Sequence, residues 1–523
     1  MKTAKSRGSV KALVMVLICC VVTLKAYSWY CWERAKRLSI VYSSDLLAEF
    51  DPCDCTEGKL GGLARRASFV AGVRKEGVPT LLLDAGGIFF QSADLPEHMK
   101  QQLSLKADSI ARAYDQMGYD VVNVGNTDLA LGLGRLLELR EGADFSVLSS
   151  NLSPSKEEDG VLPPFVIRKV GRLEVGIFGL VGGEGLAGSM KARDPVETAR
   201  KLVERLRGDV DVLIALTYQG LSKDIELARE VAGIDIIIGG RTGASLSEPR
   251  IENGTIILQT GLKGGFIGRL DLVLYNDKEP WEDATESEKY RRLALEYAEV
   301  VAKNDAILKS SDDPGERYGA QRMIDRYTKE EELARGRVKD FFGVNHFSNR
   351  VIPLRNDLED DEGILEIIRS YKLGVRRLAG EEVSAVKGQE GLYLGADSCK
   401  SCHQAEYDSW KTTQHAHAYA TLEATDQELD LECVGCHTTG YRKEGGFEAP
   451  AAVGHLKDVQ CEVCHGPGVG HPGEKAKLPL LVEKGVCLDC HTKEFNKEFK
   501  FEEFWARIAH RREKGVHQGA AGK

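Results

Sequence analysis

Seven short runs of aliphatic and β-branched residues alternate with amphipathic helical patterns in the first half of the chain. The runs span residues 38–42, 80–84, 121–124, 145–148, 175–180, 212–216 and 234–238. Short runs without polar interruption predict strands buried on both faces, with helices covering the faces of the sheet. We therefore expect a layered α/β domain of the αββα kind. Several runs end in a loop bearing Gly or Asp, and ligands usually bind at such carboxyl ends.

From residue 276 to about 380 the pattern becomes charged and helical. A first helix presents one apolar face, and the sequence Asp312-Asp313-Pro314-Gly315 ends it. A second charged helix is expected over residues 317–342 and a short one over 361–378. The stretch 351–354 cannot be helical throughout because it contains Pro353. We interpret this segment as a helical connector.

One five-residue pattern, Cys-x-x-Cys-His, occurs four times near the carboxyl terminus. Two cysteines three positions apart reach the two vinyl groups of one porphyrin as thioethers, and the adjoining histidine ligates the iron. Zinc ribbons, redox dithiols and disulfides also use Cys-x-x-Cys pairs, but histidine in the same place in four copies favours haem. The expected thioether residues are Cys399, Cys402, Cys433, Cys436, Cys461, Cys464, Cys487 and Cys490. The expected proximal iron ligands are His403, His437, His465 and His491.

Composition places the iron chemistry at one end of the chain. With 523 residues the protein is too long for one ordinary domain. The net charge of -10 gives no sign of nucleic-acid binding. Of the 12 histidines, only His98 and His346 precede residue 399. The region after residue 390 has few aliphatic runs, so we expect a mostly helical domain in which four covalently bound haem c groups form much of the core.

The first 37 residues have the features of an export signal or a signal anchor. A basic start precedes an apolar run over residues 12–24, which is short for a full membrane span. Ala26-Tyr27-Ser28 suits cleavage, whereas Trp29, Tyr30 and Trp32 suit an uncleaved anchor at a membrane interface. Both alternatives predict a periplasmic or other extracytoplasmic location. That location agrees with the haem motifs, because bacterial c-type haems are attached outside the cytoplasmic membrane.

Five ordered motifs between residues 38 and 275 resemble those of the periplasmic 5'-nucleotidase-type calcineurin-like metallophosphoesterases. They are Ser43-Ser44-Asp45-Leu46-Leu47, Leu83-Asp84-Ala85-Gly86-Gly87, Val124-Gly125-Asn126-Thr127-Asp128, Leu216-Thr217-Tyr218-Gln219-Gly220 and Ile238-Gly239-Gly240-Arg241-Thr242-Gly243. The resemblance implies an αββα sandwich whose loops converge on two metal ions.

The resemblance also exposes missing ligands. Asp45 and Asn126 match ligands of the family, and Thr127 replaces its catalytic histidine. The remaining ligand positions, which the family fills with His, Asp, His, His and His or Gln, carry Leu47, Gly87, Tyr218, Arg241 and Gly243. A two-metal hydrolase needs oxygen and imidazole donors, and an arginine puts fixed positive charge where a cation belongs. We therefore expect a vestigial site, with no catalytic residue, no dinuclear metal centre and no phosphoesterase activity.

A Cys-x-Cys pair, Cys53 and Cys55, precedes the sequence Gly61-Gly62-Leu63-Ala64-Arg65-Arg66. The combination resembles a signature of exported relatives of that phosphoesterase family. Thiols one residue apart make a poor mutual disulfide, since neighbouring side chains point apart in extended chain. Metal binding, redox chemistry, pairing with Cys31 and a structural role all stay open for this pair.

The four-motif region resembles the tetrahaem cytochromes that accept electrons from hydroxylamine oxidation. The resemblance rests on His415-Ala416-His417-Ala418 after the first motif, on Gly466-Pro467-Gly468 before His471, and on His510 after the last motif. It implies His415, His471 and His510 as distal iron ligands. For the fourth iron the alternatives are His455 and an open five-coordinate site. His417 is expected at the surface and His517 in a Gly-rich tail.

Together these patterns predict four segments: residues 1–37 for export, 38–276 phosphoesterase-like, 277–390 connecting, and 391–523 carrying haem. The expected function is electron transfer in a respiratory or redox chain. The expected partner is a redox protein or a quinone-linked membrane complex, with membrane association through the N-terminus and no nucleic acid. Two alternatives stay open: a bifunctional protein that retains metal-dependent 5'-nucleotidase activity, and a haem oxidoreductase acting at an open iron.

Overall fold

The computed structural model describes residues 35–51, 60–153, 162–186, 190–276, 280–383, 391–447, 454–471, 482–492 and 499–510. The described chain divides into two compact units. The first comprises residues 35–51, 60–95 and 110–364, and the second comprises residues 96–109 and 365–510. The predicted export segment before residue 35 and the pair Cys53 and Cys55 lie outside the described residues. None of the helices in the described ranges has the length and apolarity needed to cross a membrane.

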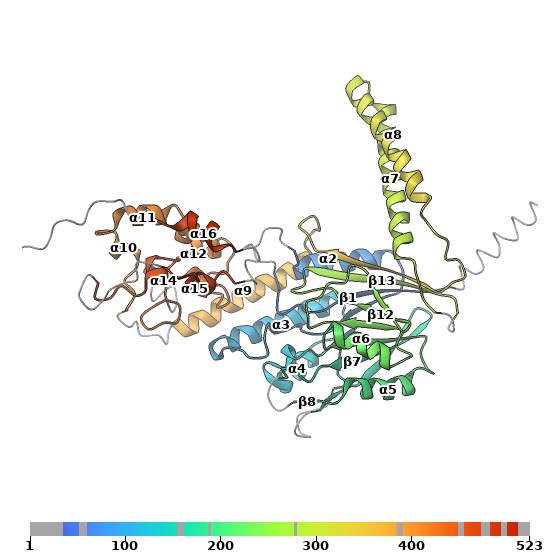
Figure 1. Cartoon of the computed structure of the whole chain (residues 1–523), viewed down its shortest axis with the longest axis horizontal. Helices are drawn as coiled ribbons and strands as arrows, with labels where there is room; N and C mark the ends of the chain where they lie inside the picture. Colours follow the sequence, from blue (N-terminus) through green and yellow to red (C-terminus); the bar gives the residue numbers. More distant parts are fainter. Residues whose placement is uncertain are drawn as a thin grey trace, which may run out of the picture. The chain divides into compact units, whose positions relative to one another are not determined.

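The first unit contains two large sheets (Figure 1). The first sheet has the order β14 (Glu282–Asp283), β15 (His346–Pro353), β13 (Phe266–Leu274), β1 (Lys36–Ser43), β2 (Thr80–Asp84), β3 (Val121–Asn123) and β4 (Ser146–Leu148). The second has the order β11 (Arg250–Glu252), β12 (Thr255–Leu258), β10 (Ile236–Gly239), β9 (Val212–Tyr218), β7 (Leu173–Val181) and β6 (Phe165–Val170). A separate pair consists of β5 (Leu152–Ser153) and β8 (Lys191–Ala192). All seven predicted strands are present.

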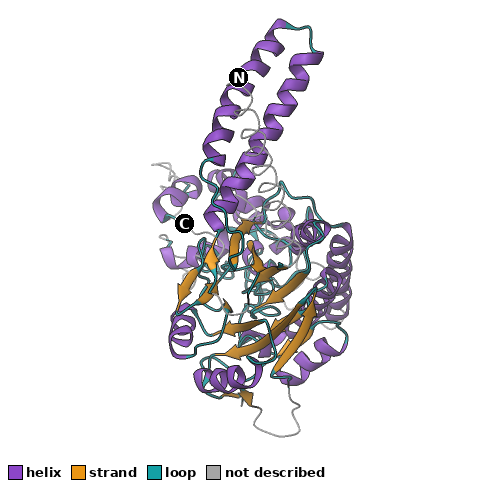
Figure 2. Cartoon of the chain, turned by 90° about the vertical axis from the view of Figure 1, so that its right-hand side faces the viewer, coloured by secondary structure: helices purple, strands orange, loops and turns teal. Residues whose placement is uncertain are grey.

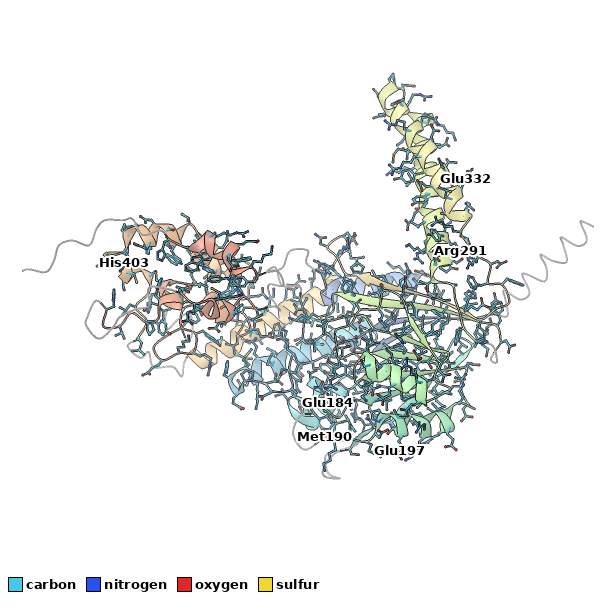
Figure 3. All side chains as sticks on the ribbon, viewed as in Figure 1. Glu184, Met190, Glu197, Arg291, Glu332 and His403 are labelled. Atoms are coloured by element: carbon cyan, nitrogen blue, oxygen red, sulfur yellow. The ribbon has the colours of Figure 1, made fainter. Side chains whose placement is uncertain are left out.

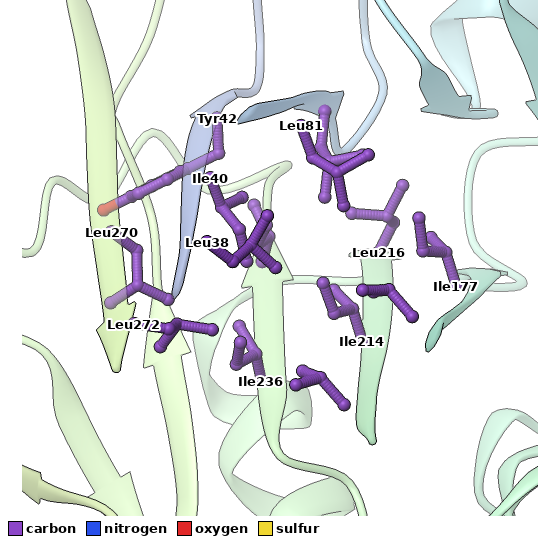
Figure 4. Close-up of a cluster of buried hydrophobic side chains, with 14 of the residues drawn as sticks. Leu38, Ile40, Tyr42, Leu81, Ile177, Ile214, Leu216, Ile236, Leu270 and Leu272 are labelled. Carbon is purple, nitrogen blue, oxygen red and sulfur yellow. The ribbon is translucent and has the colours of Figure 1, made fainter. Parts of the chain in front are cut away.

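Aliphatic side chains from alternate strand positions fill the space between the two sheets. Leu38, Ile40 and Tyr42 point inward from β1, because residues two apart share one face of a strand. Ile214 and Ile236 meet them from the second sheet (Figure 4). Burying each such side chain stabilises the fold by about 1.5–3 kcal/mol. This core fixes the positions of the parallel strands and therefore of the loops at their carboxyl ends.

Helices cover the outer faces of both sheets. On the second sheet, α5 (Pro195–Leu206) and α6 (Leu221–Glu230) pack their apolar faces against β7, β9 and β10. On the first, α2 (Leu63–Lys75) and α3 (Lys100–Met117) reach strands β1 and β2 through Arg66 and Tyr114. Helix α4 (Gly132–Glu141) follows β3. The predicted αββα layering is therefore confirmed.

The predicted helical connector contains a helical hairpin and a strand. Helices α7 (Thr285–Ser310) and α8 (Pro314–Arg335) pack side by side as a hairpin (Figure 2). Asp313 caps α8, since its Oδ1 accepts a hydrogen bond from the Glu316 amide at 2.8 Å. The chain then forms β15, which pairs antiparallel with β13. Sequence analysis missed β15, because it contains three consecutive polar residues, Ser348, Asn349 and Arg350, in place of an uninterrupted aliphatic run.

Short helices dominate the second unit. They are α10 (Ala396–Cys399), α11 (Gln404–Lys411), α12 (Ala418–Glu423), α13 (Val434–His437), α14 (Cys461–His465), α15 (Lys484–Leu488) and α16 (Phe501–Ile508). Its hydrophobic cluster of described residues is small, with Tyr393, Tyr419, Leu422, Val434, Phe447 and Leu456 buried. This cluster is too small to support so many short helices without cofactors.

Two long helices contribute residues to both units. Helix α3 supplies its first half and α9 (Glu362–Val383) most of its length to the second unit. Within that unit Gln102 Nε2 donates to Asp430 Oδ1 at 2.7 Å, and Gln102 Oε1 accepts from the Leu431 amide at 3.0 Å. Lys106 forms a largely buried ion pair with Glu432 at 2.7 Å. A segment of the phosphoesterase-like sequence is therefore bonded to the residues directly before Cys433.

We expect Gly268→Ala to lower the free energy of unfolding by about 1–3 kcal/mol. A Cβ at Gly268 would overlap the Tyr42 ring, which is held by a hydrogen bond from its hydroxyl to Asn349 Oδ1 at 2.9 Å. The matched control is Gly72→Ala on the exposed face of α2, where a Cβ meets nothing within 4 Å. Urea denaturation followed by circular dichroism should show Gly72→Ala as neutral or stabilising. Equal losses in the two variants would contradict this packing.

Candidate functional sites

The five loops that carry the phosphoesterase-like motifs meet at the carboxyl ends of their strands. Asp45 follows β1, and both of its carboxylate oxygens accept from the Arg241 amide, after β10, at 2.9 Å. Gly87 follows β2 and lies against Tyr218 at the end of β9. Parallel strands bring their carboxyl ends to one edge, which explains why positions so far apart in sequence converge.

The Tyr218 ring fills the space between these loops. A Cβ on Gly87 would overlap the Tyr218 hydroxyl, and one on Gly125 would lie 3.0 Å from the ring. A Cβ on Gly240 would lie 2.9 Å from the opposite ring edge. The Tyr218 side chain is hydrogen-bonded to Asp45, and burial raises the pKa of that carboxyl to about 6. Of these residues, Tyr218 and Gly87 occupy positions at which the family has metal ligands, and the ring takes up the space between them.

Asp128 holds two of the loops together. Its carboxylate accepts hydrogen bonds from the amides of Gly87, Ile88, Phe89 and Gly125 at 2.7–2.9 Å. Burial raises the pKa of Asp128 to about 6, while the four amide hydrogen bonds act in the opposite direction. Asp128 therefore has a structural role that needs no metal.

Asn126 and Arg241 both contact the turn at residues 182–185. The Asn126 amide donates to the Gly185 carbonyl at 3.1 Å. Arg241 Nη2 donates to the Glu184 carbonyl and to its carboxylate, both at 3.2 Å. Of the two ligands that match the family, Asp45 lies against Tyr218 and Arg241, whereas Asn126 bonds to this turn.

A buried network next to these loops was missed by sequence analysis. Arg66 is fully buried, and its Nη1 donates to Tyr114 Oη and Tyr119 Oη, both at 3.0 Å. Asp84 Oδ2 accepts from Tyr114 at 3.0 Å and from Ser43 at 2.5 Å. The Gly-Gly-Leu-Ala-Arg-Arg sequence was the available signal, but nothing in it identifies the two tyrosines.

Three pairs of imidazole rings face each other in the second unit. The ring centroids of His403 and His471 lie 6.2 Å apart, those of His415 and His491 also 6.2 Å, and those of His465 and His510 5.9 Å. A first-row metal ion bound by two imidazoles at about 2 Å per bond holds the ring centroids about 6 Å apart. Each pair joins one motif histidine to one predicted distal histidine, so the spacing fits an iron between them.

The remaining motif histidine, His437 of the second motif, has different surroundings. Its Nδ1 lies 2.6 Å from the Ala418 carbonyl, an arrangement that leaves Nε2 available for a metal. In the described part of the unit no ring contact joins another histidine to His437. His455 is exposed, and its carbonyl accepts from Gln460 Nε2 at 2.7 Å. His417 is exposed, and His517 lies outside the described residues.

Contacts between cysteine sulfurs give the order of the four motifs in space. The side chain of Cys399 in the first motif lies beside that of Cys461 in the third, and the side chain of Cys436 in the second lies beside that of Cys490 in the fourth. Cys464 of the third motif lies close enough to Cys490 for their charges to interact. The motifs therefore follow each other as first, third, fourth and second.

Glu462, between the two cysteines of the third motif, positions its neighbours. Its buried carboxylate accepts from the amides of Leu394 and Gly395 at 2.8–3.1 Å. It also accepts from the Gly468 amide at 2.6 Å. One carboxylate thus connects the chain before the first motif to the turn before His471, and so places His471 opposite His403. Figure 3 marks His403.

Comparison with known proteins finds different relatives for the C-terminal and the N-terminal parts of the chain. The family model described as cytochrome c554 and c-prime matches residues 398–466, which contain the first three motifs. Cytochrome c-554 of Nitrosomonas europaea is 36% identical over 107 residues, which are 18% of this chain and 46% of that protein.

The N-terminal part resembles nucleotidases. Snake venom 5'-nucleotidase of Gloydius brevicauda is 30% identical over 240 residues, covering 42% of this chain and 40% of that enzyme. The chain thus spans less than half the length of these curated relatives. The 5'-nucleotidase precursor from Thermus thermophilus has a TM-score of 0.47 at 19% identity, covering 69% of this chain and 61% of that one. The protein therefore combines a 5'-nucleotidase-like and metallophosphoesterase-like domain with a C-terminal cytochrome c554-like region.

Proposed function

We propose that this protein is an exported tetrahaem c-type cytochrome whose phosphoesterase-like domain has lost its hydrolase activity. The observation that carries the proposal is the set of three facing histidine pairs, each spaced for one iron. Haem c bound at the four motifs supplies one-electron redox chemistry. The chain's own contribution is to hold each group covalently, to ligate its iron and to arrange the groups in a row.

Each pair of facing histidines would supply two imidazole ligands to one iron and would leave that iron no free position for a substrate. We assign the pairs as His403 with His471, His465 with His510, and His491 with His415. Closed positions favour electron exchange over substrate binding. A second candidate function, small-molecule redox chemistry at an open iron, is favoured by one observation: no described histidine ring faces His437.

The order of the motifs suits transfer from one end of the unit to the other. The sulfur contacts put the first and second motifs at the ends of the row and the third and fourth between them. Cys402, in the first motif, is exposed, so this end is accessible to a partner. We propose a redox protein or a quinone-linked membrane complex as that partner, in an extracytoplasmic location, with the N-terminal segment available for membrane association.

The proposed loss of hydrolase activity rests on what occupies the loops. Tyr218 fills the space beside Gly87, Gly125 and Gly240, and Arg241 adds a fixed positive charge. The motif positions around this ring lack the imidazole donors that two divalent cations would need, since they carry Leu47, Gly87, Gly243 and Thr127. We therefore propose that no dinuclear metal centre forms.

For the iron ligands, we expect His510→Ala to convert one low-spin iron into a high-spin iron, because the substitution removes one of the two imidazoles that would ligate it. Low-temperature electron paramagnetic resonance of the oxidised protein, matured in an export-competent host, measures this conversion. His417→Ala is the matched control, because His417 is exposed, and it should leave the spectrum unchanged. Mass spectrometry of the same material should show four haem additions. An unaltered spectrum for His510→Ala would exclude the assigned pairing.

For the hydrolase alternative, we expect no turnover of nucleotides or generic phosphate esters by the purified protein with added Mn²⁺. Release of inorganic phosphate is the measurement, with the protein-free reaction as the blank. Turnover that Asp45→Ala abolishes would show that the domain is still an enzyme. Turnover that Asp45→Ala leaves intact would indicate a contaminating phosphatase.

Gly87→Asp, which restores one family ligand, should lower the free energy of unfolding by about 1–3 kcal/mol, because the new side chain overlaps Tyr218. Adding Tyr218→His removes the overlap. The free energy of unfolding lost in the double variant should therefore be smaller than the sum of the two single losses by at least about 0.5 kcal/mol. Urea denaturation measures the cycle. Gly87→Asp combined with Tyr297→His, in the distant hairpin, is the control and should be additive. Additivity in both cycles would argue against our proposal that the Tyr218 ring fills the space beside Gly87.

A further inference from the structure

One buried carboxylate lies between the first and third motifs. Glu462 stands inside the third motif and is only 3% exposed. Its Oε1 accepts from the amides of Leu394 at 2.9 Å and Gly468 at 2.6 Å, and its Oε2 accepts from the Gly395 amide at 2.8 Å. Amide hydrogen bonds to a carboxylate are stronger than those between neutral groups. The third motif is therefore bonded to the segment that enters the first motif and to the turn that precedes a distal histidine.

Gln460 extends this contact along the segment that enters the first motif. Its Oε1 accepts from the Ala396 amide at 2.5 Å, so Gln460 and Glu462 hold three successive amides of that segment. Cys399 follows three residues later, and its side chain lies beside that of Cys461. The two motifs are thereby held against each other where each begins.

The turn that carries His471 is in direct contact with the same carboxylate. A Cβ on Gly468 would lie 3.0 Å from Glu462 Oε1. The Val469 amide also donates to the Leu392 carbonyl at 3.1 Å, which joins this turn to the segment entering the first motif. Glu462 bonds both of these joined parts to the third motif. The position of His471 opposite the histidine of the first motif therefore depends on this carboxylate.

The charge of Glu462 also reaches both motifs. In the described part of the second unit, the lysines and arginines form ion pairs with other carboxylates and none with Glu462. Glu462 interacts electrostatically with both Cys399 and Cys461, which are thioether positions of the two motifs. Burial limits the screening of this charge by water. A negative charge near a haem stabilises ferric iron more than ferrous iron, and so lowers the reduction potential.

We propose that Glu462 is a positioning residue for the first and third haem groups, and that its charge lowers the reduction potentials of both. The inference rests on the proposed function as a tetrahaem cytochrome. The carboxylate acts through the three amides that it binds. The first and third motifs are neighbours in the row of four, so a single side chain would set both the spacing and the potentials at one end of that row.

The test uses the full-length protein, matured with its haem groups in an export-competent host. Glu462→Gln keeps the size of the side chain and one acceptor oxygen but removes the charge. A spectroelectrochemical titration should show two of the midpoint potentials raised, and low-temperature electron paramagnetic resonance should show the spin states of the parent.

Glu462→Ala leaves the three amides without their acceptor, so the turn before His471 should move. One low-spin iron should then become high-spin. His471→Ala should give the same conversion. The double variant Glu462→Ala with His471→Ala should add no further high-spin iron, because both changes act on one site.

The matched control is Asp489, which lies between the two cysteines of the fourth motif but is exposed. Solvent screens an exposed charge, so Asp489→Asn should shift the midpoint potentials less than Glu462→Gln does. Asp489→Ala should leave the spin states unchanged. If Glu462→Ala does not mature, Gly468→Ala tests the same contact, because its Cβ would press on the carboxylate and should produce high-spin iron. An unchanged spectrum of Gly468→Ala would then count against the proposal.

Two results would overturn the proposal. One is a Glu462→Ala protein that carries four haem groups and has the spin states of the parent. The other is a Glu462→Gln protein whose midpoint potentials shift no more than those of Asp489→Asn. Failure of the proposed function is distinguishable from both, because the parent protein itself would then lack the four haem additions in mass spectrometry.

Discussion

An iron between two imidazoles requires ring centroids about 6 Å apart, and the second unit keeps three histidine pairs at this spacing. Little else in that unit is able to define its fold. Its helices after residue 390 are short, and its hydrophobic cluster is small among the described residues. Glu462 shows how polar contacts assist, since one carboxylate bonds to three amides around the first motif and the turn before His471. We propose that covalently bound haem completes this core, so that ligation and folding are coupled.

In the phosphoesterase-like unit, by contrast, the hydrophobic core alone is large enough to define the fold. Its core between two sheets is extensive, and it brings the five motif loops together as the family fold requires. At that meeting point the ring of Tyr218 lies against Gly87, Gly125 and Gly240. Asp128 and Asn126 form hydrogen bonds with backbone groups of the loops. The packed core preserves the fold independently of the chemistry at its loops.

The two parts of the sequence are also more closely joined than a linear arrangement of domains implies. The segment 96–109 lies in the phosphoesterase-like stretch of the sequence, yet it belongs to the second unit. Lys106 pairs there with Glu432, one residue before Cys433. A buried ion pair of this kind costs stability if one partner is removed, which makes the scaffold segment part of the environment of the second motif.

The sequence by itself determined the local features of this protein. Uninterrupted aliphatic runs located the strands, and the Cys-x-x-Cys-His spacing identified the four motifs, because both signals lie within a few residues. Only the tertiary structure decided which groups meet across long separations. It placed Tyr218 against Gly87, paired His403 with His471 and put β15 beside β13. Such contacts depend on how strands and helices pack, and no short stretch of sequence encodes that packing.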